Sequence, residues 1–241
     1  MRPIQAELAE AIARVRQRKL TYLSARCLED LADGVAEAER DRRPGLVIEA
    51  GAALGGSAIV MALAKAPERR MRVYDAFGMI PPPSDRDGED VHRRYATIAS
   101  GRARGIGGET YYGYRANLLE EVMRSFESFG VPVDEANVEL IKGYFEQTLH
   151  VAEPVAFAHL DGDWYASTMT CLRRIEPHLV PGARVVVDDY DKWSGCRRAV
   201  DDYFKGRRGY TVERRARLHI VKDIESEQRR RWWWPARRVR S

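Results

Sequence analysis

Two pairs of aspartates are the residues whose types and spacing point most directly to chemistry. Each pair stands at the end of an apolar run, in the segments LDGDWY and VVVDDY. The four residues are Asp161, Asp163, Asp188 and Asp189. If the two runs are parallel strands joined by one helix, their carboxyl ends meet and the four carboxylates share one small space. Carboxylates that lie so close together raise one another's pKa.

A hard divalent cation would resolve this repulsion. Ligands that are all oxygens suit Mg²⁺, with Ca²⁺ and Mn²⁺ as alternatives. Zinc is not indicated, because no cysteine is near and His159 is expected to point to the opposite face from Leu160. The alternative without a metal is that Asp188 and Asp189 cap the following helix while Asp163 is solvated.

A glycine-rich turn supplies the second group of candidate residues. The segment EAGAALGGS, residues 49–57, follows an apolar run and opens a helix. Glycines allow a tight turn and a close ligand approach, and a helix N-terminus offers free N–H groups. Asp75 ends the next apolar run, where a carboxylate can accept both ribose hydroxyls of NAD or of S-adenosylmethionine. The alternatives are a turn that binds nothing and a helix N-cap at Asp75.

The elements that must position these residues alternate between strand and helix. Two helices are predicted over residues 4–40 from apolar residues at helical spacing. Strands are predicted at 46–51, 71–77, 137–143, 155–163 and 183–190, and further helices at 55–66, 115–129, 166–179 and 195–206. YTVERRA and LHIVKD predict a closing antiparallel pair. This order indicates an α/β fold with a doubly wound, mostly parallel, Rossmann-like sheet, which binds ligands at the carboxyl ends of its strands.

Residues 78–113 are too long for a plain connector, and they predict a lid insertion. Tyr111, Tyr112 and Tyr114 at its end could stack on sugar faces or could pack within the protein. Trp193, after the second aspartate pair, could wall the same pocket or belong to the core.

Composition and charge predict a single domain over residues 1–227 with a basic tail. The 241 residues carry a net charge of +4, but residues 228–241 hold six arginines and no acid, so the remainder carries −2. A near-neutral body does not indicate a groove for nucleic acid. Sparse cysteines and the lack of a signal-like or membrane-spanning apolar run favour a cytoplasmic protein. The Trp/Arg tail is expected to be disordered, with weak contact to a membrane surface or to nucleic acid as alternatives.

Longer segments around these residues resemble one family. HLDGDWYxST, followed by PGARVVVDDYxxWxGCRRAVDDY, is similar to the macrocin O-methyltransferase (TylF/MycF) family. Its members are class I S-adenosylmethionine-dependent methyltransferases that modify hydroxyls, chiefly of sugars on natural products. VIEAGxxxGGSA, YDAFGMIPPP and LIKGYFEQTL agree, so the resemblance spans about 20–223 in order.

The resemblance implies a role for each matching position. It implies that Asp161, Asp188 and Asp189 are the ligands of Mg²⁺, and that Asp163 is a base beside the reacting hydroxyl, with Asp161 also in the catalytic site. The residues implied to bind S-adenosylmethionine are Glu49, Gly51, Ser57, Asp75, Lys142, Gly143, Tyr144, Thr21 and Ser24. The chain departs from the family pattern at Ala53-Leu54, where a Trp-Arg pair is usual, and at Gly78-Met79, where an acid is usual. The region 84–113 also differs, so no macrolide acceptor is implied.

The sequence therefore predicts a Mg²⁺-dependent O-methyltransferase that acts on a hydroxyl of a small molecule, in particular a sugar on a natural product or glycan. A second class, an NAD-dependent oxidoreductase, explains Gly51 and Asp75 but leaves both aspartate pairs without a role. A third class is a membrane-associated binding protein that uses the tail. The N-terminal helices could serve a homodimer.

Overall fold

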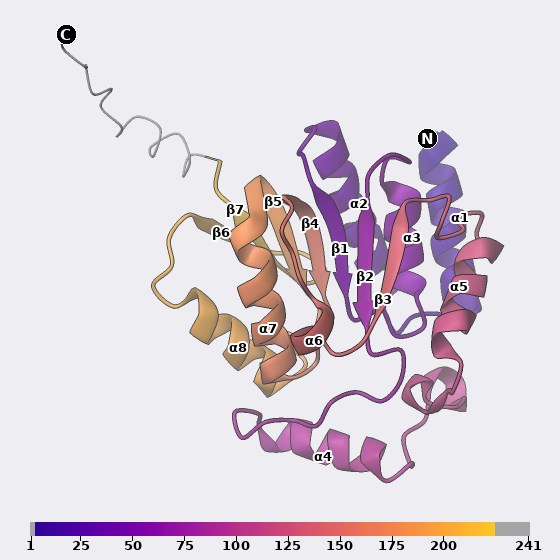
Figure 1. Cartoon of the computed structure of the whole chain (residues 1–241), viewed down its shortest axis with the longest axis vertical. Helices are drawn as coiled ribbons and strands as arrows, with labels where there is room; N and C mark the ends of the chain where they lie inside the picture. The colour runs from indigo at the N-terminus through magenta and orange to yellow at the C-terminus, as the bar shows by residue number, and fades with distance from the viewer. Residues whose placement is uncertain (1–2, 225–241) are drawn as a thin grey trace.

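The computed structural model describes residues 3–224, so the predicted tail at 228–241 lies outside the described residues. At its centre is a seven-stranded sheet with the strand order β3-β2-β1-β4-β5-β7-β6 (Figure 1). The strands are β1 Leu46–Ala50, β2 Met71–Asp75, β3 Val138–Lys142, β4 Val155–Leu160, β5 Leu179–Val187, β6 Tyr210–Arg214 and β7 Leu218–Lys222. Strands β1 to β5 pair in parallel, whereas β7 is antiparallel to both β5 and β6. The predicted fold class is confirmed.

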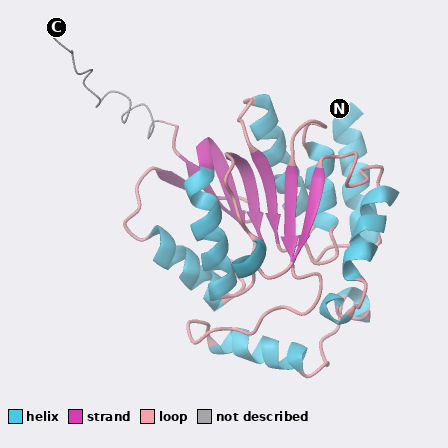
Figure 2. Ribbon diagram, in the orientation of Figure 1, coloured by secondary structure: helices cyan, strands magenta, loops and turns pink. Residues whose placement is uncertain are grey.

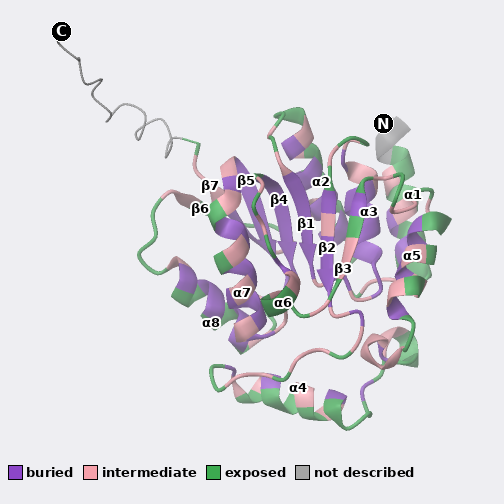
Figure 3. Cartoon of the chain, in the orientation of Figure 1, coloured by how far each residue is buried: buried purple, intermediate pink, exposed green. Residues whose placement is uncertain are grey.

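Helices cover both faces of this sheet (Figure 2). One face carries α1 Pro3–Gln17, α2 Ala25–Arg40, α3 Gly56–Ala64 and α5 Leu118–Ser128, and the other carries α6 Phe145–Thr148, α7 Tyr165–Ile175 and α8 Ser194–Phe204. Alternate strand residues face the two layers, so Val47 joins one apolar core while Leu46 and Ile48 join the other. Because both faces are covered, β1 is buried along its whole length, and all its residues except Glu49 are apolar (Figure 3).

The predicted lid contains α4, Glu89–Ala99, which belongs to neither layer. Figures 1 and 2 show α4 beyond the carboxyl ends of the strands, and its Asp90 contacts the start of α8. It has a small apolar cluster of its own, made by Ile98, Ala103 and Tyr111. The predicted lid therefore lies at the edge of the sheet to which the glycine turn and the aspartate pairs also belong.

Element boundaries differ from the predictions where local spacing carries little information. Strand β5 begins at Leu179 rather than at 183, because Leu179 already pairs with Val155 of β4. Helix α6 was not predicted, since four residues are too few to show helical periodicity. Within residues 3–224, every helix is too short or too polar to cross a bilayer.

Gly34→Ala tests the packing of α2 on β4. A methyl group at Gly34 would lie 2.4 Å from Cε2 of the buried Phe157 ring. Alanine usually stabilises a helix relative to glycine, but here we expect the displaced ring to lower the free energy of unfolding by about 1–3 kcal/mol. Urea denaturation measures the change, and Gly34→Ala should cost less in a Phe157→Leu background, where the ring that it meets is absent. A Gly34→Ala variant as stable as the parent would contradict this packing.

Candidate active site at the carboxyl edge of the sheet

The glycine turn between β1 and α3 is held in place by Asp75. One carboxylate oxygen of Asp75 accepts the backbone N–H groups of Ala52 and Ala53 at 2.8 and 2.9 Å, and the other accepts that of Phe77 at 2.6 Å. Burial raises the pKa of Asp75, although these three donors act to lower it. Gly51 has a φ of 98°, and a Cβ there would lie 1.9 Å from the carbonyl oxygen of Asp161. The turn is therefore packed directly against the loop that carries the first aspartate pair.

Two adjacent pockets open at this edge. We call the first the Tyr144 pocket; its walls include Gly51, Asp75, Gly143, Tyr144, Asp161 and Trp164. We call the second the Trp193 pocket; it adds Tyr22, Arg94, Tyr111, Lys192, Trp193 and Arg217. Both pockets share Asp75, Asp161 and Asp163. The Tyr144 pocket and the Trp193 pocket thus meet at these three aspartates.

The residues implied to bind a cofactor fall into two groups. Four of them, Gly51, Asp75, Gly143 and Tyr144, line the Tyr144 pocket. The other five, Glu49, Ser57, Lys142, Thr21 and Ser24, are not among its lining residues. Ser24 caps α2 by accepting the N–H of Cys27, and the Thr21 hydroxyl accepts that of Leu23.

Glu49 and Ser57 lie buried beneath the turn. Glu49 is fully buried, accepts the Ser57 hydroxyl, and faces Nδ1 of His159 across 2.9 Å. Burial acts to lower the pKa of His159, but Glu49 and Asp188 outweigh it and raise that pKa to about 10. The imidazolium is thus a buried positive charge between two carboxylates. Glu49 supports the floor of the site through this contact.

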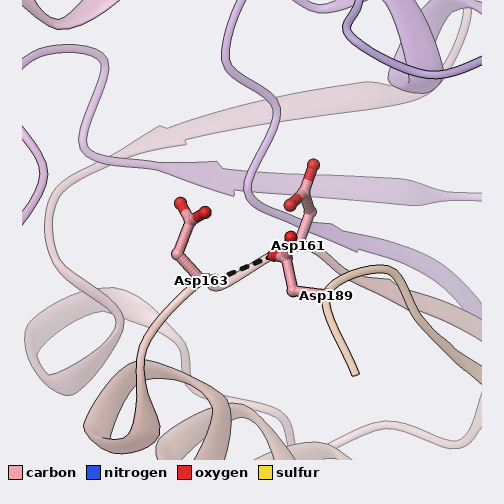
Figure 4. Close-up of side chains that lie close together, drawn as sticks. All are labelled: Asp161, Asp163 and Asp189. Carbon is pink, nitrogen blue, oxygen red and sulfur yellow. Dashed lines mark hydrogen bonds between the residues drawn. The ribbon is translucent and has the colours of Figure 1, made fainter. Parts of the chain in front are cut away.

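Three aspartates, Asp161, Asp163 and Asp189, form what we call the acidic centre. One oxygen from each lies within 4.8 Å of the others, and their side chains are shown in Figure 4. They meet because β4 and β5 are parallel neighbours with Leu160 opposite Val187. The backbone N–H of Asp163 donates to Oδ2 of Asp189 at 3.1 Å, the dashed line in Figure 4. The geometry expected from the two strand ends is present for these three residues.

The electrostatics of the acidic centre are those of crowded, buried acids. Burial and then Asp189 raise the pKa of Asp161 well above its usual value, and they raise that of Asp163 to about 7. Oδ1 of Asp189 is buried and has no hydrogen-bond partner, with Nζ of Lys192 at 3.5 Å. Asp163 also has a φ of 53°, a backbone conformation that is uncommon for residues other than glycine and clusters at functional sites.

Asp188 lies beside the acidic centre rather than within it. Its Oδ1 accepts Nε–H of Arg217 at 2.6 Å and lies 3.8 Å from Nε2 of His159. Burial acts to raise the pKa of Asp188, but His159 and Arg217 together lower it. The structure therefore brings Asp161, Asp163 and Asp189 together, as the two strand ends predicted, but pairs Asp188 with an arginine instead.

Aromatic rings wall the Trp193 pocket. Tyr111 and Tyr112 line it with ring centroids 4.4 Å apart, whereas the Tyr114 hydroxyl donates to the carbonyl of Ile98 in α4. Trp193 donates its Nε1–H to Oδ1 of Asp163 at 3.0 Å. Tyr112 and Trp193 therefore wall the pocket, Tyr111 lines it while packing in the buried cluster with Ile98, and Tyr114 packs within the protein.

Sequence reasoning missed several residues of the Trp193 pocket. They are Tyr22, Arg94, Lys192 and Arg217. Lys192 could have been suspected, because it stands three residues after Asp189 at a strand end. The others come from distant segments, and nothing in the local pattern marks them.

Comparisons with known proteins agree with this geometry. The family model described as macrocin O-methyltransferase (TylF) matches residues 16–213. The chain is 37% identical over 190 residues to the 8-demethyl-8-(2,3-dimethoxy-alpha-L-rhamnosyl)-tetracenomycin-C 4'-O-methyltransferase of Streptomyces olivaceus. The matched residues make up 76% of this chain and 64% of that protein. It is 30% identical over 202 residues to the mycinamicin III 3''-O-methyltransferase of Micromonospora griseorubida, covering 80% of this chain and 73% of the relative.

A solved structure extends the likeness to three dimensions. The O-methyltransferase NovP superposes with a TM-score of 0.69 at 25% identity, covering 84% of this chain and 81% of NovP. The match of the family model takes in the glycine turn, both aspartate pairs and most of the sheet. The chain belongs to the macrocin O-methyltransferase family.

Proposed function

We propose that this protein transfers the methyl group of S-adenosylmethionine to a hydroxyl of a glycosylated small molecule, with Mg²⁺ held at the acidic centre. The observation that carries the proposal is the meeting of two pockets at three crowded carboxylates. One pocket would take the methyl donor and the other the acceptor.

The charge of the Tyr144 pocket favours S-adenosylmethionine over NAD. Four acids are among its lining residues, which include no lysine, arginine or histidine: Asp75, Glu146, Asp161 and Asp163. S-adenosylmethionine carries a sulfonium cation and no phosphate, whereas NAD would bring a doubly charged pyrophosphate against these carboxylates. Tyr144 offers a ring for an adenine to stack on, and Asp75, in the same pocket, would accept the ribose hydroxyls.

The acids of the acidic centre fit a divalent cation. The buried Oδ1 of Asp189 has no hydrogen-bond partner, and oxygens of Asp161 and Asp163 lie within 4.8 Å of Asp189. Asp161 and Asp189 would hold Mg²⁺, with oxygen ligands of the kind it prefers. Asp188, the third predicted ligand, could bind Mg²⁺ only if its ion pair with Arg217 were broken.

The bound groups would supply an electrophilic methyl and Lewis acidity beside the acceptor oxygen. Asp163 is the candidate base. It lines both pockets, and a carboxylate beside the acceptor hydroxyl can accept its proton. The Trp193 indole holds one Asp163 oxygen in a fixed direction.

The Trp193 pocket supports an acceptor that carries a sugar. The flat rings of Tyr111, Tyr112 and Trp193 suit the C–H faces of a sugar. Both curated relatives described above are named for methylating a hydroxyl of a natural product, and the first names a rhamnosyl group. The hydroxyl to be methylated would lie beside Asp163.

Binding measurements separate the two cofactors. We expect S-adenosylmethionine to raise the melting temperature and NAD to leave it unchanged, because NAD meets repulsion in the Tyr144 pocket. At a ligand concentration one hundred times Kd, the stabilisation would be about 2.7 kcal/mol. Differential scanning calorimetry measures the melting temperature with each cofactor. Transfer of a labelled methyl group to rhamnosylated aromatic and macrolide acceptors then tests the reaction. Stabilisation by NAD alone would instead favour the oxidoreductase.

Asp189→Asn tests the role of the acidic centre. The amide keeps an oxygen for the Asp163 N–H but removes one of the three crowded acids. We expect the metal-free variant to be more stable than the parent, because like-charge repulsion among the buried acids falls. It should also lose the stabilisation that Mg²⁺ gives the parent, together with methyl transfer.

Asp191→Asn is the matched control, because Asp191 is two residues away, exposed, and paired with Arg214 on the surface. Thermal melts with Mg²⁺ and with EDTA measure both effects. A Mg²⁺ response retained in Asp189→Asn, or full methyl transfer by the parent in EDTA, would contradict the metal site.

A further inference from the structure

Two carboxylates of the predicted lid cap helices that belong to the body of the protein. Oδ1 of Asp87 accepts the backbone N–H of Tyr165, the first residue of α7, at 2.7 Å. Oδ2 of Asp90 accepts the N–H of Ser194, the first residue of α8, at 3.0 Å, and its Oδ1 accepts the Ser194 hydroxyl at 2.5 Å. These are the helices that follow the two aspartate pairs along the chain.

Neither helix has a capping side chain of its own. The residues at the N-cap positions are Trp164 and Trp193, and neither makes a side-chain capping bond. An indole has a donor but no acceptor, so it cannot satisfy the free N–H groups at a helix start. The caps that α7 and α8 lack locally are therefore supplied by the lid, from 78 and 104 residues away.

Two glycines allow the lid to approach so closely. A Cβ at Gly195 would lie 1.8 Å from Oδ1 of Asp87, and one at Gly88 would lie 2.3 Å from the Ser194 hydroxyl oxygen. An ion pair of 2.6 Å between Arg86 and Asp202 of α8 lies beside them. The start of α4 and the start of α8 are thus closely packed, with no room for a side chain at either glycine.

The two tryptophans connect these caps to the acidic centre. Trp193 directly precedes Ser194 and donates to Oδ1 of Asp163 at 3.0 Å. Trp164 donates to the carbonyl of Pro81 in the lid at 3.0 Å. The two rings pack edge to face with centroids 5.7 Å apart, and both line the Trp193 pocket. A shift at either helix start would therefore move a ring that contacts the candidate base or its neighbour.

We propose that Asp87 and Asp90 are positioning residues that set the orientation of Asp163 through Trp164 and Trp193, so that the placement of the lid and of the base are coupled. This inference rests on the function proposed above. The acceptor must occupy the Trp193 pocket, which the lid helps to wall with Arg94, Ile98 and Tyr111. The carboxylate of Asp163 is then oriented toward the acceptor only while the lid covers that pocket.

Asp90→Ala tests this coupling. We expect kcat to fall about tenfold, the size of effect that loss of one capping interaction can produce, while the Kd for S-adenosylmethionine stays unchanged. Asp90→Asn, which keeps an oxygen to accept the Ser194 N–H, should recover most of the loss. Glu89→Ala is the control, because Glu89 is the exposed neighbour and pairs only along α4 with Arg93.

A double-mutant cycle distinguishes positioning from a general loss of structure. If Asp90 acts through Trp193, then Asp90→Ala/Trp193→Phe should be no slower than Trp193→Phe alone. If the fold-losses in kcat of the two single variants multiply in the double variant, the proposal is overturned. It is also overturned if Asp90→Ala weakens cofactor binding as much as it lowers kcat. Should Asp90→Ala fail to fold, Ser194→Ala, which removes only the hydroxyl that donates to Asp90, replaces it in the same cycle with Trp193→Phe.

Hydrogen exchange gives a readout that does not need activity. In Asp90→Ala, exchange should accelerate in peptides covering 160–165 as well as in those covering 189–196, because the tryptophan pair transmits the change. Acceleration at 189–196 alone would refute the coupling. A parent protein that transfers no methyl group would instead refute the proposed function, so the two failures are distinguishable.

Discussion

Mutual repulsion among Asp161, Asp163 and Asp189 shapes much of the structure around the site. Oxygens of all three lie within 4.8 Å, at the ends of strands that are themselves deeply buried. Charges so close in a medium that screens poorly destabilise the fold unless they are neutralised or protonated. The raised pKa values of Asp161 and Asp163 express that penalty. A fold that keeps such an arrangement gives up stability at this place, which is typical of functional sites.

The positive charges nearby are placed to offset the repulsion in part. Arg217 pairs with Asp188, and Lys192 approaches Asp189 from the rim of the pocket. His159 is held protonated between Glu49 and Asp188 beneath the floor. Since His159 also contacts Glu49, which bonds to Ser57 at the start of α3, the glycine turn and the second aspartate pair are connected through buried groups. The residual negative charge faces the Tyr144 pocket, where a cationic methyl donor would be favoured.

Membership in the macrocin O-methyltransferase family accounts for the fold, whereas the walls of the Trp193 pocket come from segments outside the sheet. Arg94 and Tyr111 come from the predicted lid, Tyr22 from the segment between α1 and α2, and Arg217 from the turn before β7. These segments are all peripheral to the sheet. Variation in such segments can change the acceptor without disturbing the strand ends that carry the acids.

The fold class, the glycine turn and the convergence of Asp161 with Asp189 follow from the sequence, because they depend on short-range patterns. Apolar runs that alternate with helical spacing specify parallel strands, and residues just after two neighbouring strands must lie at the same edge. Long-range partners were decided only in the tertiary structure. Asp188 bonds to Arg217, which lies 29 residues further on, and the caps of α7 and α8 come from Asp87 and Asp90. No periodicity encodes such pairs, because they depend on how the connections fold back over the edge of the sheet.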